Sequence, residues 1–242
     1  MKIFSKYSEY YDFIYQQKNY LKETNYVLSH LKKKPHNILD IGCGTGTHLK
    51  FFNKKKIKTT GIDFSRKMIK IAKKKNPGLK FFHKDAKNFL FENKFDLITS
   101  LFHVTSYINK DKDLLKIFKN VKKHLNKNGT YIFDYWYREA VKKDKPYLRV
   151  KKFYIKNNEF IKISEPYFDK KLKEIDLNFY LIEKRKGKKR LFTEKHFMRS
   201  YNPNELFKIL KLAGFKKMFA YEWLSNKNVN KNNWNACIVA RN

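Results

Sequence analysis

The chain has 242 residues, of which 42% are hydrophobic and 17% aromatic, enough for one domain with a sizeable core. No apolar run approaches the ~20 residues of a membrane span, and the first residues lack the apolar block of a signal peptide. The only cysteines are Cys43 and Cys237, too few for a disulfide or zinc framework. We therefore expect a reduced, cytoplasmic protein with no membrane partner.

The formal net charge of +34 favours a polyanionic partner such as a nucleic acid. Lysine, however, supplies 49 of the 56 basic residues and arginine only 7, whereas contacts to bases and phosphates favour arginine. The lysines are also spread along the chain among many Asn, Ile, Phe and Tyr residues, a mixture typical of coding bias toward A and T. We expect no specific nucleic-acid partner, although the positive electrostatic field of these lysines would suit a phosphorylated small substrate.

Residues 5–32 have a helical pattern that is unusually aromatic for a surface helix. The aromatic and apolar positions are Tyr7, Tyr10, Tyr11, Phe13, Ile14, Tyr15 and Tyr20. Two interpretations stay open with equal weight. The helix either packs its aromatic stripe on the domain or closes as a lid over a ligand.

The stretch 37–49 is the strongest motif in the chain. It predicts a buried strand, a turn and the start of a helix, with glycines in the turn at Gly42, Gly44 and Gly46. A second strand is predicted over 57–62 and ends at Asp63. In a βαβ nucleotide site, a carboxylate about 20 residues beyond the first glycine hydrogen-bonds the ribose hydroxyls. Asp40 would repel a pyrophosphate and suits a cationic ligand.

These motifs, together with Asp85 after a third strand over 79–83, resemble the S-adenosylmethionine-dependent methyltransferases of the Rossmann-like class. The resemblance covers residues 35–135. It implies S-adenosyl-L-methionine as cofactor, with the adenine amino group on Asp85 and a ring nitrogen on the backbone of Ala86. The full set of cofactor-binding residues that it implies is Tyr11, Tyr20, Asp40, Gly42, Gly44, Asp63, Phe64, Asp85, Ala86 and Leu101.

A narrower resemblance lies in the N-terminal segment. Tyr10-Tyr11-Asp12-Phe13-Ile14-Tyr15, followed by Tyr20, is similar to the start of the nucleotide-sugar N-methyltransferases, which dimethylate amino sugars linked to dTDP. Tyr11 and Tyr20 fall on that family's tyrosines, at a shorter spacing here.

The acceptor site is expected where the fourth strand, 95–102, and the fifth, 130–137, end, because open α/β sheets bind ligands at their carboxyl edge. His103 and Tyr107 follow the fourth strand and are the candidate catalytic bases. The related amino-sugar enzymes carry a serine near 103 and a histidine near 107, so this chain departs from their order. Tyr135 and Trp136 are expected to wall the substrate.

Alternating strands are predicted over 148–154, 159–164, 174–183 and 189–201, which favours an antiparallel insertion. Two residues of the last strand, His196 and Arg199, are candidate substrate contacts. They fall on opposite faces of a regular strand, so only one of them can face the site. The remaining predictions are helices over 46–54, 66–75, 111–126 and from 203 to 213, and closing strands over 215–223 and 234–240.

The fold class predicted is α/β, a Rossmann-like seven-stranded methyltransferase sheet with helices on both faces and an inserted antiparallel β lobe. We expect a single domain over 1–242, with a helical lid over 1–34 and an acceptor lobe over 138–201. No metal is required for methyl transfer, and no Cys/His/Asp cluster suggests one.

The expected function is methyl transfer to an amino or hydroxyl group of a small-molecule acceptor, namely a sugar, with nucleotide-linked sugars among the candidates. The alternatives are an RNA methyltransferase and a non-catalytic S-adenosylmethionine-binding protein. A homodimer stays open.

Overall fold

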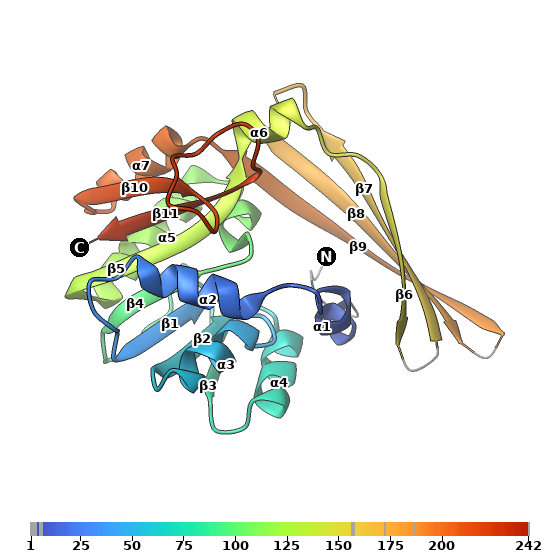
Figure 1. Ribbon diagram of the computed structural model, residues 1–242, viewed down its shortest axis with the longest axis horizontal. Helices are drawn as coiled ribbons and strands as arrows, with labels where there is room; N and C mark the ends of the chain where they lie inside the picture. The colour runs from blue at the N-terminus through green and yellow to red at the C-terminus, as the bar shows by residue number, and fades with distance from the viewer. Residues whose placement is uncertain (1–3, 5–6, 156–157, 172, 186, 242) are drawn as a thin grey trace.

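The computed structural model describes residues 4, 7–155, 158–171, 173–185 and 187–241 (Figure 1). Its helices are η1 (Tyr7–Glu9), α1 (Tyr11–Ile14), α2 (Tyr20–Ser29), α3 (Thr47–Lys54), α4 (Arg66–Lys75), η2 (Val104–Tyr107), α5 (Asp111–His124), α6 (Arg138–Lys143) and α7 (Pro203–Leu212). Its strands are β1 (Asn37–Ile41), β2 (Lys58–Asp63), β3 (Lys80–His83), β4 (Phe95–Ser100), β5 (Leu125–Tyr137), β6 (Arg149–Ile155), β7 (Asn158–Phe168), β8 (Glu174–Arg185), β9 (Lys188–Tyr201), β10 (Lys217–Glu222) and β11 (Asn235–Arg241).

The parallel part of the sheet has the order β3-β2-β1-β4-β5. On its other side β5 pairs antiparallel with β11, which in turn pairs antiparallel with β10. Parallel neighbours need crossover connections, and α3 and α4 provide those between β1, β2 and β3. The carboxyl ends of β1, β2, β4 and β5 therefore meet at one edge, where a ligand is expected.

Both faces of this sheet are buried, because successive residues of each strand point to opposite sides. In β1, Ile38 packs with α2, α3 and α4, whereas Leu39 packs with α5 and α7. Each of these two side chains is 0% exposed. The predicted α/β class with helices on both faces is thereby confirmed.

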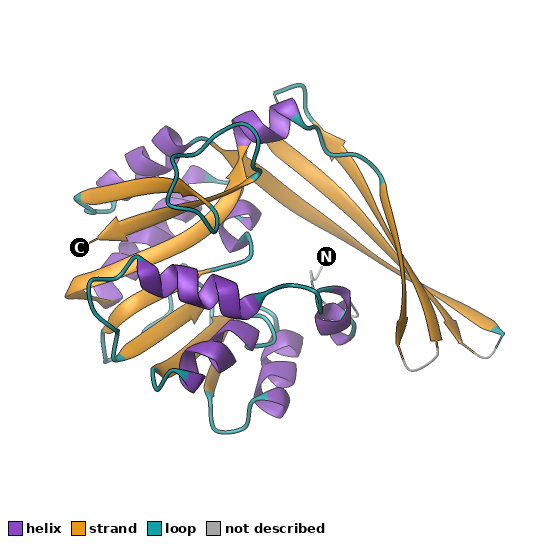
Figure 2. Cartoon of the chain, viewed as in Figure 1, coloured by secondary structure: helices purple, strands orange, loops and turns teal. Residues whose placement is uncertain are grey.

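The inserted strands β6 to β9 form an antiparallel ribbon that extends beyond the helices (Figure 2). The seven strands β3, β2, β1, β4, β5, β11 and β10 make up the predicted seven-stranded sheet, and the four inserted strands join it, so that the described residues form one connected sheet of 11 strands. The link is short. It consists of Trp136 pairing with Ser200 and Tyr137 pairing with Tyr201 in parallel register. The ribbon thus starts from the end of β5, next to the carboxyl edge.

The N-terminal segment is divided into η1, α1 and α2, where the sequence predicted one helix over 5–32. Asn19 interrupts the helix, because its side chain accepts a hydrogen bond from the backbone N–H of Lys22 at 2.9 Å and caps a new helix start. Figure 1 shows α1 between the main sheet and the ribbon, while α2 lies on the sheet. Residues 1–3 and 5–6 of the predicted lid lie outside the described residues.

The other predicted boundaries differ by a few residues. The helix predicted over 111–126 ends at His124, and Asn128 and Gly129 belong to β5, at an irregularity in its pairing with β4. In the described part of the chain, none of the helices has both the length and the apolar character needed to cross a membrane.

Candidate cofactor and acceptor site

The three glycines of the turn after β1 all have left-handed backbones, with φ values of 71° at Gly42, 53° at Gly44 and 78° at Gly46. A Cβ at Gly42 would lie 2.5 Å from the Val104 side chain, and one at Gly46 would lie 2.5 Å from the Phe81 ring. These two glycines allow close packing. A Cβ at Gly44 would meet no other atom within 4 Å, so Gly44 is the one that leaves room for a ligand.

Asp63 binds the glycine turn directly. Its Oδ2 accepts the backbone N–H of Gly44 at 2.9 Å, and its Oδ1 accepts the N–H of Ser65 at 2.7 Å. Burial raises the pKa of Asp63, although these two hydrogen bonds oppose the rise. Each carboxylate oxygen can accept a second hydrogen bond, so Asp63 can still receive two ribose hydroxyls.

Phe64, next to Asp63, is 74% exposed although it is a large apolar side chain. Its backbone carbonyl lies 2.9 Å from Nε2 of His83 on β3. An exposed ring beside a ribose-type carboxylate can stack on an adenine base.

Asp40 lies below the turn and not on its surface, being only 1% exposed. Its Oδ1 accepts a hydrogen bond from the Thr99 hydroxyl at 2.7 Å. Burial raises the pKa of Asp40 from its ordinary value of 3.8 to about 6, against the opposing effects of His48 and Thr99. Asp40 can therefore attract a cation through its charge, but direct contact would need a path through the turn.

The predicted adenine contacts have local partners. Oδ1 of Asp85 accepts the backbone N–H of Lys87 at 2.9 Å, and the Lys87 ammonium lies 3.5 Å from Oδ2. Asp85 thus stabilises its own turn. Ala86 is partly buried against the core cluster on one face of the sheet, and Leu101 is 3% exposed in the cluster on the other face.

The N-terminal segment closes one side of this edge. Oδ1 of Asp12 accepts the Thr45 hydroxyl of the glycine turn at 2.6 Å, and its Oδ2 pairs with the Lys75 ammonium at 2.6 Å. Tyr11 lies edge-on to Phe102, which follows β4, with 6.2 Å between the ring centroids. The Lys18 ammonium lies 4.1 Å from the centroid of the Phe102 ring.

Tyr20 packs edge-on against His48 of α3 with ring centroids 4.8 Å apart. Nε2 of His48 in turn lies 2.7 Å from Oε2 of Glu23, whose other oxygen binds Lys18. Burial alone would raise the pKa of Glu23, but the hydrogen bonds and charges of His48 and Lys18 lower it to about 2. The structure places Tyr20 on this buried pair, beside the first turn of α3.

His103 lies at the end of β4, in a strained turn. Phe102 and His103 are consecutive non-glycine residues with φ of 67° and 64°, a conformation that tends to occur at functional sites. Asp134 of β5 holds the turn, accepting the His103 backbone N–H at 3.0 Å and lying 3.1 Å from its Nδ1. The Trp136 ring lies 5.9 Å from the imidazole.

Tyr107, in η2, hydrogen-bonds His196 of β9, with 2.9 Å between the hydroxyl and Nδ1. Tyr107 and Trp136 pack against the same small cluster formed by Val141, Ile175 and Met198. These contacts bring the expected fourth-strand, fifth-strand and ribbon residues to one place.

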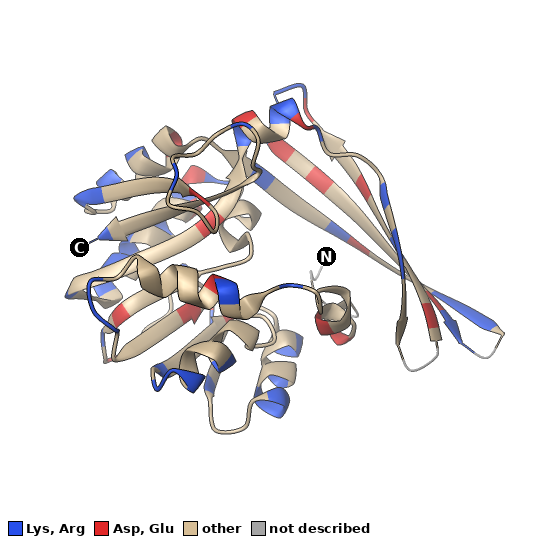
Figure 3. Cartoon of the chain, viewed as in Figure 1, with Lys and Arg blue, Asp and Glu red and all other residues tan. Residues whose placement is uncertain are grey.

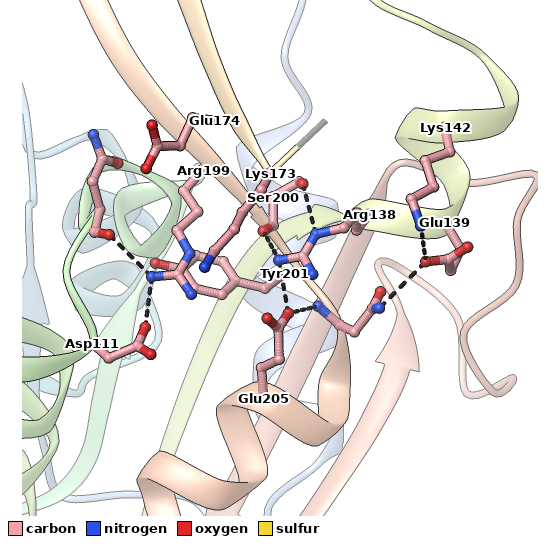
Figure 4. Close-up of polar contacts among 12 residues, drawn as sticks. Asp111, Arg138, Glu139, Lys142, Lys173, Glu174, Arg199, Ser200, Tyr201 and Glu205 are labelled. Carbon is pink, nitrogen blue, oxygen red and sulfur yellow. Dashed lines mark hydrogen bonds and ion pairs between the residues drawn. The ribbon is translucent and has the colours of Figure 1, made fainter. Parts of the chain in front are cut away.

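The structure differs from the sequence analysis at two of the expected substrate contacts. Tyr135 is 0% exposed inside the core, because the alternation of β5 turns it toward α7. Arg199 is 3% exposed and donates to Asp111 at 2.6 Å and to the Asn109 carbonyl at 3.0 Å (Figure 4), whereas His196 binds Tyr107. Both side chains are held by contacts within the protein. Of the other two candidates, Trp136 is partly buried beside His103, and His196, itself 1% exposed, reaches the site through Tyr107.

A comparison with protein families matches residues 38–129 to a model described as a methyltransferase domain. Residues 38–129 are therefore similar to a methyltransferase domain. This match spans β1 to the start of β5 and includes the glycine turn, Asp63, Asp85 and His103.

Two curated relatives extend the comparison. The chain is 27% identical over 135 residues to a dTDP-3-amino-3,4,6-trideoxy-alpha-D-glucopyranose N,N-dimethyltransferase of Streptomyces venezuelae, covering 54% of this chain and 57% of the relative. It is 28% identical over 179 residues to malonyl-acyl-carrier-protein O-methyltransferase 1 of Ilyobacter polytropus, covering 68% of this chain and 65% of the relative. The chain thus spans less than two thirds of the length of either relative.

A solved structure matches the fold over almost the whole chain. It is the S-adenosylmethionine-bound CalS10, an amino pentose methyltransferase from Micromonospora echinaspora involved in calicheamicin biosynthesis. The TM-score is 0.79 at 17% identity, covering 100% of this chain and 99% of that one. The methyltransferase fold, including the ribbon, is therefore shared with a solved methyltransferase.

Sequence reasoning missed several residues that the methyltransferase domain and its surroundings use. Asp12, Asp134 and Glu194 each bind a candidate site residue or the glycine turn, and Glu23 binds His48, against which the candidate Tyr20 packs. A signal existed for Asp134, which interrupts a buried run in the fifth strand, and for Glu194, which shares a strand face with His196. Asp12 and Glu23 had no such signal, because their partners lie far along the chain.

Proposed function

We propose that this protein transfers a methyl group from S-adenosyl-L-methionine to the amino group of a nucleotide-linked sugar. The observation that carries the proposal is the carboxyl edge itself. There the open side of Gly44, the carboxylate of Asp63 and the exposed ring of Phe64 lie beside an aromatic N-terminal segment that contacts both the turn and the ribbon.

The cofactor would lie along this edge. Asp63 would accept the ribose hydroxyls, Phe64 would stack on the adenine, and Asp85 with the backbone of Ala86 would bind its polar edge. Asp40 would attract the positive charge of the cofactor from below the turn. When bound, the cofactor supplies an electrophilic methyl group on a sulfonium.

The acceptor would lie between His103, Tyr107 and Trp136, under the ribbon. Holding the acceptor nitrogen, the methyl carbon and the sulfur in line can lower the barrier by ~7–11 kcal/mol. An ammonium must also lose a proton before it can attack, so a base within reach would speed the reaction near neutral pH. The Tyr107 hydroxyl is hydrogen-bonded to His196, and Nδ1 of His103 lies 3.1 Å from the Asp134 carboxylate, so each candidate base has a neighbour that can stabilise a transferred proton.

The choice of an amino sugar is supported by the dTDP-amino-sugar N,N-dimethyltransferase and by the amino pentose methyltransferase described above. The Ilyobacter relative is an O-methyltransferase of a carrier-bound substrate, but this chain's N-terminal Tyr-Tyr-Asp-Phe-Ile-Tyr segment resembles the amino-sugar enzymes. Nucleic acid is not favoured, because Figure 3 shows Lys and Arg spread over helices, strand ends and ribbon tips. A homodimer stays a prediction.

The test is a methyl-transfer assay with labelled cofactor and matched pairs of dTDP-sugars that carry an amino or a hydroxyl group at the same carbon. We expect methylation of the amino member and little transfer to the hydroxyl member. The Asp63→Ala variant serves as the control for cofactor-dependent signal. Preference for the hydroxyl sugars, or no transfer to any sugar by a protein that binds S-adenosylhomocysteine, would refute the proposal.

A further inference from the structure

A buried series of hydrogen bonds runs from Tyr107 into the base of the ribbon. The Tyr107 hydroxyl lies 2.9 Å from Nδ1 of His196, and Nε2 of His196 lies 3.3 Å from Oε2 of Glu194. His196 is 1% exposed and Glu194 is 6% exposed. If Nε2 carries the hydrogen and donates to Glu194, Nδ1 is free to accept the Tyr107 proton.

The surroundings of His196 keep water away from these hydrogen bonds. Aromatic rings enclose the imidazole, with Phe179 at 4.6 Å and Phe4 at 5.1 Å between ring centroids. The ionisable groups that face it are Tyr107, Glu194 and Tyr7, and the Lys162 ammonium lies behind the Phe179 ring at 4.4 Å. Glu194 is therefore the nearest negative charge that can stabilise a protonated His196.

Glu194 also anchors the N-terminal segment. Its two oxygens accept the backbone N–H groups of Phe4 at 2.9 Å and Tyr7 at 3.3 Å. The carboxylate that backs His196 is thus fixed by the same segment that contacts the glycine turn through Asp12. The N-terminal segment therefore helps to hold the Glu194 carboxylate in position behind His196.

We propose that Tyr107, His196 and Glu194 form a proton relay that deprotonates the acceptor, an inference that rests on the proposed amine acceptor. The N–H bond of the substrate ammonium breaks as an O–H bond forms on Tyr107. The original Tyr107 proton passes to Nδ1 of His196, and the imidazolium pairs with Glu194. The amine keeps its electron pair and attacks the methyl group.

The phenol must act as a conduit and not as a stored phenolate. Burial, with the added effects of Tyr15 and Glu194, raises the pKa of Tyr107 well above its ordinary value of 10.0. Loss and gain of the proton at the Tyr107 oxygen are therefore concerted. Tyr107 is the catalytic residue, because it touches the acceptor, while His196 and Glu194 act through it.

The experiment compares turnover of the full chain from pH 6 to pH 10 in four variants. Tyr107→Phe removes only the hydroxyl. His196→Asn keeps an acceptor atom near the Nδ1 position but cannot take up a proton. Glu194→Gln removes the charge. Glu183→Gln is the matched control, since Glu183 is a buried ribbon carboxylate, 5% exposed, that accepts from Tyr10 and does not contact His196.

We expect kcat near neutral pH to fall about 10²-fold in Tyr107→Phe and in His196→Asn, with unchanged affinity for S-adenosylhomocysteine. In His196→Asn the loss should shrink as the pH passes the pKa of the substrate amine, because the amine then arrives already deprotonated. Glu194→Gln should show a smaller loss of the same kind. Glu183→Gln should behave like the wild type.

A loss in His196→Asn that is the same at every pH would show a structural role and overturn the relay, as would unchanged turnover. If His196→Asn fails to fold, Tyr107→Phe decides by the same criterion. Preference of the wild type for hydroxyl sugars would refute the proposed function separately. The same variants would then be measured with the hydroxyl sugar as substrate. If Tyr107→Phe and His196→Asn both kept the kcat of the wild type on that sugar, the relay would be overturned.

Discussion

Replacing Asp40 by asparagine should stabilise the ligand-free protein at neutral pH while weakening its affinity for the cofactor. Asp40 is 1% exposed, and burial raises its pKa from 3.8 to about 6, partly offset by His48 and Thr99, with Asp63 and Asp134 adding to the rise. The folded state therefore binds the Asp40 proton more tightly than the unfolded chain does. Ionised Asp40 costs stability above pH 6, and this cost disappears as the pH falls below about 4.

The magnitude follows from the shift of the Asp40 pKa from 3.8 to about 6, which corresponds to about 3 kcal/mol at pH 7 to 8. The same linkage gives about 1.5 kcal/mol at pH 5 and less than about 1 kcal/mol at pH 4. The amide in the Asp40→Asn variant would be neutral throughout and could still accept the Thr99 hydroxyl, so any constant packing difference adds equally at every pH. The pH-dependent part of the difference isolates the charge.

The assay is urea unfolding of wild type and Asp40→Asn at intervals from pH 4 to pH 8, with the free energies of unfolding subtracted at each pH. The stability of the variant relative to the wild type should rise with pH and level off above about pH 7. Calorimetry with S-adenosylmethionine at pH 8 should show weaker binding by the variant. A stability difference that does not change with pH would refute the argument that Asp40 is buried as an ion.

Three further predictions test the cofactor edge and the charge. Asp63→Ala should weaken S-adenosylhomocysteine binding by ~1.5–3 kcal/mol for each ribose hydrogen bond lost, and unchanged calorimetric affinity would place the ribose elsewhere. Asp12→Asn should lower the free energy of unfolding by less than ~1 kcal/mol, because the Lys75–Asp12 pair is partly exposed. The same variant should bind the cofactor more weakly if the N-terminal segment acts as a lid. An affinity equal to that of the wild type would favour a segment that only packs on the domain. Methylation of RNA at near-physiological salt should be negligible beside that of sugars, and comparable rates would restore a nucleic-acid substrate.

Much of the fold could be predicted from the sequence because its signals are local. The run from Asn37 to Ile41, the glycine turn and the strand that ends at Asp63 define a βαβ unit within one short stretch of chain. Strand alternation likewise separated His196 from Arg199, and the structure places the two residues in different networks. Patterns of this kind depend only on neighbours along the chain.

Contacts between distant residues could not be predicted in this way. The partners Glu194 and Phe4 are 190 residues apart, and His103 reaches Asp134 across two neighbouring strands. The same limit explains Tyr135, which was expected at the substrate wall. The sequence placed it correctly at the end of a strand, but only the packing of α7 and β5 shows which face it occupies.

The N-terminal segment contacts both the ribbon and the glycine turn, and these contacts differ in strength. Toward the ribbon, Tyr7 and Ile14 are 2% and 3% exposed in an apolar cluster with Phe153, Phe160 and Leu181. Toward the glycine turn, the segment uses the partly exposed contacts of Asp12, and such surface ion pairs contribute at most ~1 kcal/mol each. Full burial of a large apolar side chain contributes ~1.5–3 kcal/mol, so the ribbon side is the stronger attachment.

Any opening of this segment should therefore separate it from the turn and leave it on the ribbon. In that case the relay through Glu194 would stay assembled while the cofactor edge opened. Replacing Asp12 should therefore affect cofactor entry more than replacing Glu194.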